Sequence, residues 1–270
     1  MQITHITDKG SSEVNDDRYL VGKNIFAVFD GATAILNNYK GPDGTTTAGL
    51  AAEIAKNAFA KEDKPLKELA LVATKTIRKA MEEKETDLSD KAKLWSTTVA
   101  AIQLKESTFE WIQIGDSPIL IIYKDESHKI LFEEYDHDKE LLTKWSKLAK
   151  EGEKEMFKIL KEECAQLRRQ ANVTYGFLNG EDDLKEFIEC GEEPLENIQH
   201  ILLLTDGLIY PKENLQNKDD FKPIVEAFLK GGINNIKKTV RDIENNDPEC
   251  VKYPRFKKHD DATVIAITFD

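Results

Sequence analysis

The chain has 270 residues, of which 40% are hydrophobic and 33% are charged, a composition typical of folded globular proteins. It carries 50 acidic and 38 basic residues, and the resulting formal charge of −12 would repel a nucleic-acid backbone over most of the surface. The sequence lacks a long apolar run and a signal-peptide pattern at its start, so we expect a cytoplasmic protein without nucleic-acid or membrane partners.

No linker rich in proline, glycine or serine divides the sequence, so residues 1–270 are expected to form a single domain. The three cysteines, Cys164, Cys190 and Cys250, lie far apart in the chain and are odd in number. This pattern fits neither a disulfide framework nor a zinc cluster, and it predicts buried free thiols.

The first strands are expected before residue 30. Residues 2–7 alternate weakly between apolar and polar side chains, which predicts an edge strand. Asp17 directly precedes a further strand-like run. Residues 25–29 are apolar throughout, which predicts a strand buried on both faces. This strand leads directly into Asp30 and Gly31. The aspartate would therefore stand at the edge of the core, and the glycine would let a ligand approach the main chain closely.

Two helices are expected between residues 45 and 84. Thr45 or Thr46 can cap the first helix, whose apolar residues recur at helical spacing up to Phe59. The second helix is expected over 65–84, with a proline in its first turn, where no hydrogen-bond donor is lost. Both apolar stripes indicate surfaces that face the core.

The hydrophobic period then changes from that of a helix to that of a strand. The sequence predicts strands over 95–104, 109–115 and 119–123, and a short fourth one over 130–132. Because the connecting turns are short, we expect an antiparallel meander. The second of these strands leads into Asp116, so a carboxylate again follows an apolar strand.

Residues 138–170 are strongly charged, with apolar residues at helical spacing and an interruption at Gly152. They predict one broken amphipathic helix or two consecutive ones. A short strand is expected after them, over 186–190.

The end of the chain repeats the pattern seen at Asp30. The apolar run 201–204 leads to Asp206 and Gly207, and two amphipathic helices are expected after them. In the last strand the order is reversed, because Asp260 precedes the apolar run. An antiparallel neighbour runs in the opposite direction, so Asp260 would lie at the same sheet edge as Asp30 and Asp206.

If these strands share one core, several carboxylates converge at its rim. Two carboxylates about 4 Å apart repel each other by about 4 kcal/mol at an effective dielectric constant near 20, so such a cluster requires cations. Carboxylate and carbonyl oxygens without cysteine or paired histidine suit Mg²⁺ or Mn²⁺ better than zinc. The alternative is that each aspartate is a separate turn residue. The converging residues would be Asp17, Asp30, Asp116, Asp206 and Asp260.

Six short motifs in this order resemble those of the metal-dependent (type 2C) protein serine/threonine phosphatases over nearly the whole chain. The segment 172–180 also resembles a stretch of some bacterial members of that family. The resemblance implies an α+β fold, a four-layer α-β-β-α sandwich of two antiparallel sheets flanked by helices. It also implies a helical flap insertion at about residues 138–180. The motifs are Asn15-Asp16-Asp17, Phe29-Asp30-Gly31, Ser96-Thr97-Thr98, Gly115-Asp116-Ser117, Thr205-Asp206-Gly207 and Asp260-Asp261-Ala262-Thr263.

The same resemblance implies hydrolysis of phosphoserine and phosphothreonine on a phosphorylated protein substrate. A water molecule activated by two Mn²⁺ or Mg²⁺ ions would be the nucleophile, no covalent phosphoenzyme would form, and the enzyme would act as a monomer. Its catalytic residues would be Asp30, Asp206 and Asp260. The metal-binding residues would be Asp30 as a bridging ligand, Gly31 through its carbonyl, Asp206 and Asp260 as the remaining ligands, Asp17 through metal-bound water, and Asp116 at a third, weaker site.

Three positions depart from the family pattern. Ser12 stands where many members have a phosphate-binding arginine, Ala32 where a histidine is common, and Pro118 where arginine is usual. These departures keep open a non-catalytic binding or regulatory protein with the same fold. A haloacid-dehalogenase-type phosphatase is disfavoured, because Val28 occupies the position two residues before Asp30 where that family has its nucleophile.

Overall fold

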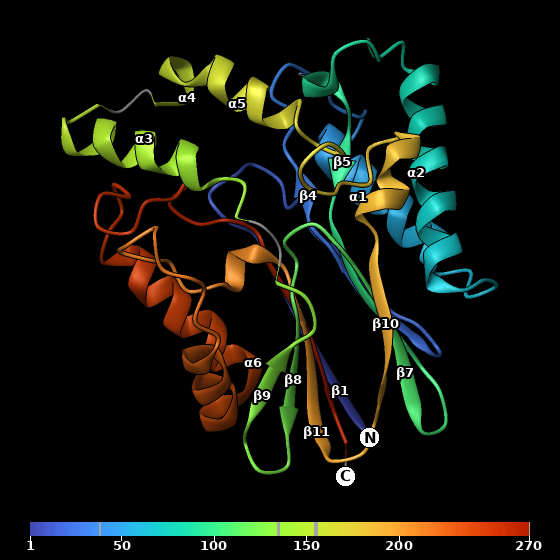
Figure 1. Cartoon of the computed structure of the whole chain (residues 1–270). Helices are drawn as coiled ribbons and strands as arrows, with labels where there is room; N and C mark the ends of the chain where they lie inside the picture. The colour runs from blue at the N-terminus through green and yellow to red at the C-terminus, as the bar shows by residue number, and fades with distance from the viewer. Residues whose placement is uncertain (38, 134–135, 154–155, 270) are drawn as a thin grey trace.

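The computed structural model describes residues 1–37, 39–133, 136–153 and 156–269 (Figure 1). Two five-stranded antiparallel sheets pack face to face. Figure 1 shows α1 (Thr47–Phe59) and α2 (Leu66–Glu83) beside one sheet and α6 (Lys222–Asn245) beside the other. The α+β sandwich of four layers, expected from the sequence, is therefore confirmed.

All strand pairs in both sheets are antiparallel, as are those of a small two-stranded sheet, β4 (Gly31–Ala32) with β5 (Ser96–Thr97). We name the two large sheets after a central strand of each. The β11 sheet has the order β1 (Gln2–Asp8), β12 (Ala262–Thr268), β11 (Ile198–Leu204), β8 (Ile119–Tyr123) and β9 (His128–Ile130). The β3 sheet has the order β10 (Glu189–Pro194), β7 (Thr108–Ile114), β6 (Val99–Leu104), β3 (Ile25–Phe29) and β2 (Arg18–Val21).

Strand β3 is buried on both faces, as its apolar sequence predicts. Ile25 and Phe29 face α1 and α2, whereas Phe26 and Val28 face the other sheet. This alternation follows from the two-residue period of a strand. Because both faces are covered, the strand has a fixed register, and the position of Asp30 just beyond it is fixed as well.

Strands β11 and β12 divide their side chains in the same way. Leu202 and Val264 pack against α6, whereas Leu203 and Ile265 pack against the β3 sheet. These two strands are neighbours, with Leu204 opposite Val264. The end of β11 and the start of β12 therefore lie side by side.

The predicted meander is wrong at one connection. Strands β6 and β7 pair with each other, but β8 lies in the β11 sheet between β11 and β9. The chain crosses between the sheets at Gly115, whose φ of +80° favours glycine. Hydrophobic periodicity identifies the faces of a strand and not its partner, which explains the error. The first strand of the set is interrupted between β5 and β6, and the last lies at 128–130 instead of 130–132.

The charged stretch after β9 forms three helices, α3 (Lys139–Lys150), α4 (Met156–Ile159) and α5 (Lys161–Arg168). Figure 1 shows them across one end of the sandwich, opposite the end where the two termini lie. The strand expected over 186–190 is instead β10 at 189–194, which follows a 3-10 helix, Asp182–Phe187. Cys190 of this edge strand is exposed, contrary to expectation, whereas Cys164 and Cys250 are buried free thiols as predicted.

Helix α6 is kinked, which reconciles it with the two helices expected from the sequence. Gly231 and Gly232 have non-helical backbone angles, and the φ of Gly232 is +68°. Buried residues on both sides of the kink, including Ile224 and Ile236, pack on the β11 sheet. Among the helices of the described residues, none is long and apolar enough to cross a membrane.

Candidate metal centre

A cavity of about 140 Å³ is lined by residues from the strand ends and from the helical stretch α3–α5. A second cavity of about 230 Å³ shares part of this lining, including Asp116, Asp206 and Asp260. Five of the six metal-binding residues predicted from the sequence line the first cavity: Asp30, Gly31, Asp116, Asp206 and Asp260. Residues more than 200 positions apart in the chain thus meet at one site, which separate turns would not produce.

The main chain at Asp30 is fixed by two threonines of a neighbouring segment. The Asp30 carbonyl oxygen accepts hydrogen bonds from the Thr98 backbone amide at 2.9 Å and from the Thr97 hydroxyl at 2.7 Å. Both threonines are buried. The carboxylate therefore leaves a rigid backbone, so its direction depends only on its own side-chain torsions.

Gly31 is required by close packing. A Cβ atom at this position would lie 2.7 Å from the carbonyl oxygen of Asp16 and 2.9 Å from the carbonyl of Ala48. The φ of Gly31 is outside the positive region, so glycine is needed here for space and not for a left-handed backbone conformation. Any larger residue would displace the backbone beside Asp30.

Asp206 and Asp260 are brought together by the pairing of β11 with β12. The Thr205 amide donates to the Thr263 carbonyl at 2.9 Å, and the Thr263 amide donates to the Thr205 hydroxyl oxygen at 2.9 Å. A Cβ at Gly207 would lie only 1.9 Å from the carbonyl oxygen of Asp261. This contact holds the turn after β11 directly against the segment that carries Asp260.

Asp261, next to Asp260, has a structural role. Its carboxylate accepts hydrogen bonds from the backbone amides of Gly10 and Asp16, each at 2.7 Å. Only 5% of Asp261 is exposed. It therefore joins the loop after β1 to the start of β12, a role that the sequence did not indicate.

Asp17 is the predicted site residue that lines neither of the two cavities. Its carboxylate is buried and accepts a hydrogen bond from the Thr205 hydroxyl at 2.8 Å. Burial, together with the charges of Asp261 and Asp260, raises the pKa of Asp17 to about 7 although the threonine hydrogen bonds oppose this rise. This position outside the cavity lining is compatible with a contact to the centre through water.

The carboxyl groups of Asp30 and Asp206 perturb each other. Burial raises the pKa of both groups well above the usual range, and the charge of Asp206 raises that of Asp30 further. Full ionisation of both groups is therefore costly in this buried site. The pair cannot be fully ionised unless a cation lies close by.

The donor chemistry of this site fits a hard divalent cation, since the cavity offers several carboxylates. Cys164 also lines the cavity, but burial raises the pKa of its thiol and so disfavours the thiolate that would bind a soft metal. However, no group of three or more histidine, cysteine, aspartate or glutamate side chains in the described parts of the chain is arranged to hold an ion. Asp260 instead pairs with a lysine at 2.7 Å.

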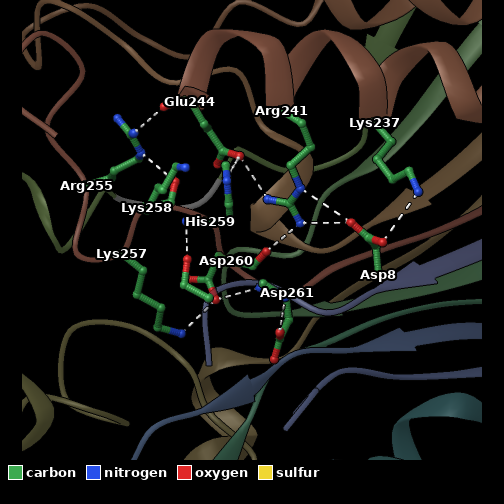
Figure 2. A network of polar contacts seen from close by, with 12 residues as sticks. Asp8, Lys237, Arg241, Glu244, Arg255, Lys257, Lys258, His259, Asp260 and Asp261 are labelled. Carbon is green, nitrogen blue, oxygen red and sulfur yellow. Dashed lines mark hydrogen bonds and ion pairs between the residues drawn. The ribbon is translucent and has the colours of Figure 1, made fainter. Parts of the chain in front are cut away.

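The lysine is Lys257, which the sequence analysis did not single out. Its Nζ lies 2.7 Å from Oδ1 of Asp260, and Figure 2 shows its side chain directed at that carboxylate. Burial alone would lower the pKa of Lys257, but the charges of Asp260, Asp30 and Asp206 outweigh this effect and raise that pKa. Lys257 is one of 38 lysine and arginine residues, and nothing in the sequence distinguishes it from the others.

A polar network fixes the loop that carries Lys257 and Asp260 (Figure 2). Glu244 of α6, which is 4% exposed, binds the Arg241 guanidinium at 2.9 Å and Nδ1 of His259 at 2.7 Å. Arg241 also donates to the carbonyl oxygen of Asp260 at 2.7 Å. The loop is therefore anchored to the kinked helix through its main chain.

The helical stretch contributes an aromatic and basic wall to the 140 Å³ cavity. The ring of His137 stacks on Tyr175 at 3.8 Å between centroids, and the Arg168 guanidinium lies 4.8 Å from the centre of the Phe177 ring. Nη1 of Arg168 is buried without a hydrogen-bond partner among the described residues. The sequence did not predict this wall, because its residues come from two segments around the charged helices.

Two of the positions that differ from the family pattern can be located relative to the cavities. Ala32 lines the 140 Å³ cavity, whereas Ser12 lines neither cavity. Arg18, another cation near the start of the chain, binds the carbonyl oxygens of Asn15 and Asp17 and forms an ion pair with Glu53 at 2.9 Å. It is thus committed to local structure.

The chain was compared with known protein families and structures. A family model described as Protein phosphatase 2C matches residues 7–240. Asp260 lies beyond the matched range, so its assignment depends on the strand pairing and the motif that precedes β12. No curated protein sequence matches the chain.

Several solved structures share the fold over the full length of the chain. The catalytic domain of the serine/threonine protein phosphatase PstP, in complex with two manganese ions, has a TM-score of 0.61 at 18% identity, covering 100% of this chain and 98% of that one. PstP/Ppp of Mycobacterium tuberculosis has a TM-score of 0.60 at 15% identity, with coverages of 100% and 98%. Stp1 of Staphylococcus aureus has a TM-score of 0.61 at 15% identity, with coverages of 100% and 95%.

Proposed function

This chain belongs to the protein phosphatase 2C family, and from that premise we propose that it is a metal-dependent protein phosphatase. Its substrate would be phosphoserine or phosphothreonine on a protein. The observation that carries this proposal is the meeting of Asp30, Asp116, Asp206 and Asp260 in one cavity at the end of the sandwich. The fold shared with a phosphatase solved with two manganese ions supports it.

We assign the metal-binding roles to Asp30, Gly31, Asp206 and Asp260, with Asp116 at a third, weaker position. When bound, Mn²⁺ or Mg²⁺ would neutralise phosphoryl oxygens and acidify a water molecule that attacks phosphorus. Asp17 would hold its position through the Thr205 hydroxyl and orient water at the rim of the centre.

The protein's own contribution is a fixed set of carboxylates. Thr97 and Thr98 hold the backbone of Asp30, and the pairing of Thr205 with Thr263 holds Asp206 beside Asp260. Such preorganisation lets the carboxylates bind cations without first ordering the chain.

We further assign residues 138–180 as a helical flap within a single domain that spans 1–270. The aromatic wall of His137, Tyr175 and Phe177 lines one side of the cavity, where it would limit the access of water. Arg168 from the same wall presents an unpaired Nη1 group among the described residues. These groups would face a phosphorylated side chain that enters the cavity.

A second candidate function is a regulatory protein that keeps the fold without efficient turnover. Ser12 places no cation at the cavity, and Arg18 is occupied by Glu53 and two carbonyl groups. A protein of this kind would bind metal and phosphorylated protein but release little phosphate.

The test is phosphate release from a phosphothreonine peptide with millimolar Mn²⁺, and with EDTA in its place. We expect release that requires the metal and is abolished in Asp206→Asn. Asp63→Asn, an exposed aspartate between α1 and α2, serves as the matched control and should retain activity. Metal binding without any phosphate release would favour the regulatory protein instead.

A further inference from the structure

Lys257 places a positive charge at both cavities. Among the residues that the structure describes, it is the one lysine or arginine that lines both cavities. Its ammonium group contacts Asp260 at 2.7 Å, and the charges of Asp30 and Asp206 act on it as well. A cation therefore already stands among the carboxylates that we assign to the metal centre.

The backbone on both sides of Lys257 is fixed. Before it, Arg255 forms an ion pair with Asp247 at 3.0 Å and donates to the carbonyl oxygen of Glu244 at 3.1 Å. After it, His259 exchanges two hydrogen bonds of 2.9 Å with Ser11. The loop cannot carry the lysine away from the cavity, so its ammonium group moves only by rotation of its own flexible side chain.

An ammonium group in this position needs an anionic acceptor. In the structure, Asp260 meets this need. A divalent cation on the same carboxylate would take over most of its negative charge, and the ammonium would lose attraction to it. A phosphoryl group entering the cavity is then the strongest acceptor within reach, and lysine binds phosphate as a point charge.

We propose that Lys257 is the phosphate-binding cation of this cavity. Its ammonium group pairs with Asp260 while the carboxylates hold no metal, and it turns to the phosphoryl group of the substrate once divalent cations occupy them. The proposal rests on the proposed phosphatase function for the identity of the substrate. It has two separable consequences, one for metal binding and one for phosphate binding.

The first consequence is competition with metal. Lys257→Gln removes the charge that competes for Asp260, so Mn²⁺ should bind the variant about three- to tenfold more tightly than wild type. Isothermal titration calorimetry of the metal-free protein with Mn²⁺, without phosphate, measures this. Lys258→Gln makes the same charge change at the neighbouring exposed residue and should leave the affinity unchanged. If Lys257→Gln bound Mn²⁺ as tightly as wild type or more weakly, the proposal that Lys257 competes with metal for Asp260 would be wrong.

The second consequence is the contact with phosphate. In calorimetric titration of the Mg²⁺-loaded protein with inorganic phosphate, Lys257→Gln should bind phosphate about ten- to a hundredfold more weakly, as expected for loss of a charge-assisted hydrogen bond. Lys257→Arg should restore most of the affinity, and Lys258→Gln should match wild type. Unchanged phosphate affinity in Lys257→Gln would overturn the proposal.

Kinetics separate this proposal from the phosphatase function. If wild type releases phosphate from the peptide and Lys257→Gln changes neither KM nor phosphate binding, the function stands and the role of Lys257 is refuted. If wild type shows no turnover but binds phosphate through Lys257, the role of the lysine stands and the phosphatase function is refuted. If both hold, Lys257→Gln should raise KM more than it lowers kcat.

Discussion

Replacing Asp17 with asparagine should stabilise the metal-free protein at pH 8. Asp17 is 4% exposed, and burial is the main reason that its pKa rises to about 7. The folded protein holds this proton more tightly than the unfolded chain does, whose carboxyl has a pKa near 3.8. Stability is therefore lost as the pH rises from about 4 to about 7.

The magnitude follows from the two pKa values. The difference between 3.8 and about 7 corresponds to about 4 kcal/mol of lost stability above pH 7 and to about 2 kcal/mol at pH 5. Asparagine carries no charge, and its amide oxygen can still accept the hydrogen bond of the Thr205 hydroxyl. Asp17→Asn should thus gain up to about 4 kcal/mol at pH 8 and about half as much at pH 5.

Urea unfolding in EDTA, followed by tryptophan fluorescence at both pH values, measures these differences. The exposed Asp63→Asn should change the midpoint at neither pH, which controls for the loss of one negative charge. A midpoint for Asp17→Asn below that of wild type at pH 8 would refute the reasoning. It would mean that the Asp17 carboxylate is a structural acceptor whose hydrogen bonds outweigh its burial.

Three further outcomes are expected. Mn²⁺ at a hundred times its dissociation constant should stabilise the folded protein by about 2.7 kcal/mol. If Mn²⁺ left the melting temperature unchanged, the carboxylates would not form a common metal site. Asp30→Asn and Asp206→Asn should abolish phosphate release while the metal-free variants melt no lower than wild type, since each removes one member of a repelling pair; a drop of several degrees in calorimetry would indicate a structural role. Gly207→Ala should lower the free energy of unfolding by about 1–3 kcal/mol or more, because its methyl group would meet the Asp261 carbonyl, and an unchanged urea midpoint would show that the turn can relax.

The sequence predicted the meeting point of the strand ends because it depends on local pattern, whereas the four layers were implied by the family resemblance. The run 25–29 is apolar at every position, so burial on both faces and the place of Asp30 follow from composition alone. The reversed order at Asp260 predicted its position beside Asp206, since the pairing of β11 with β12 is antiparallel. That these aspartates bind metal stays a prediction.

The features that the sequence did not reveal depend on long-range packing. Strand β8 has the same apolar alternation wherever it pairs, so its place in the β11 sheet could not be read from its residues. Lys257 resembles the many solvated lysines of this chain until the fold places it beside Asp260. Asp17 lies outside the cavity lining and is hydrogen-bonded to Thr205, and its expected contact through metal-bound water stays a prediction.

The position of β12 has a consequence for synthesis. This strand lies between β1 and β11, yet it is made after every other strand of both sheets. Until it is added, β1 and β11 have no common neighbour, and each presents an unpaired edge that can associate with other chains. The Thr205–Thr263 contacts and Asp260 arrive with the same segment. A nascent chain therefore completes the β11 sheet and brings Asp260 beside the end of β11 in one late step.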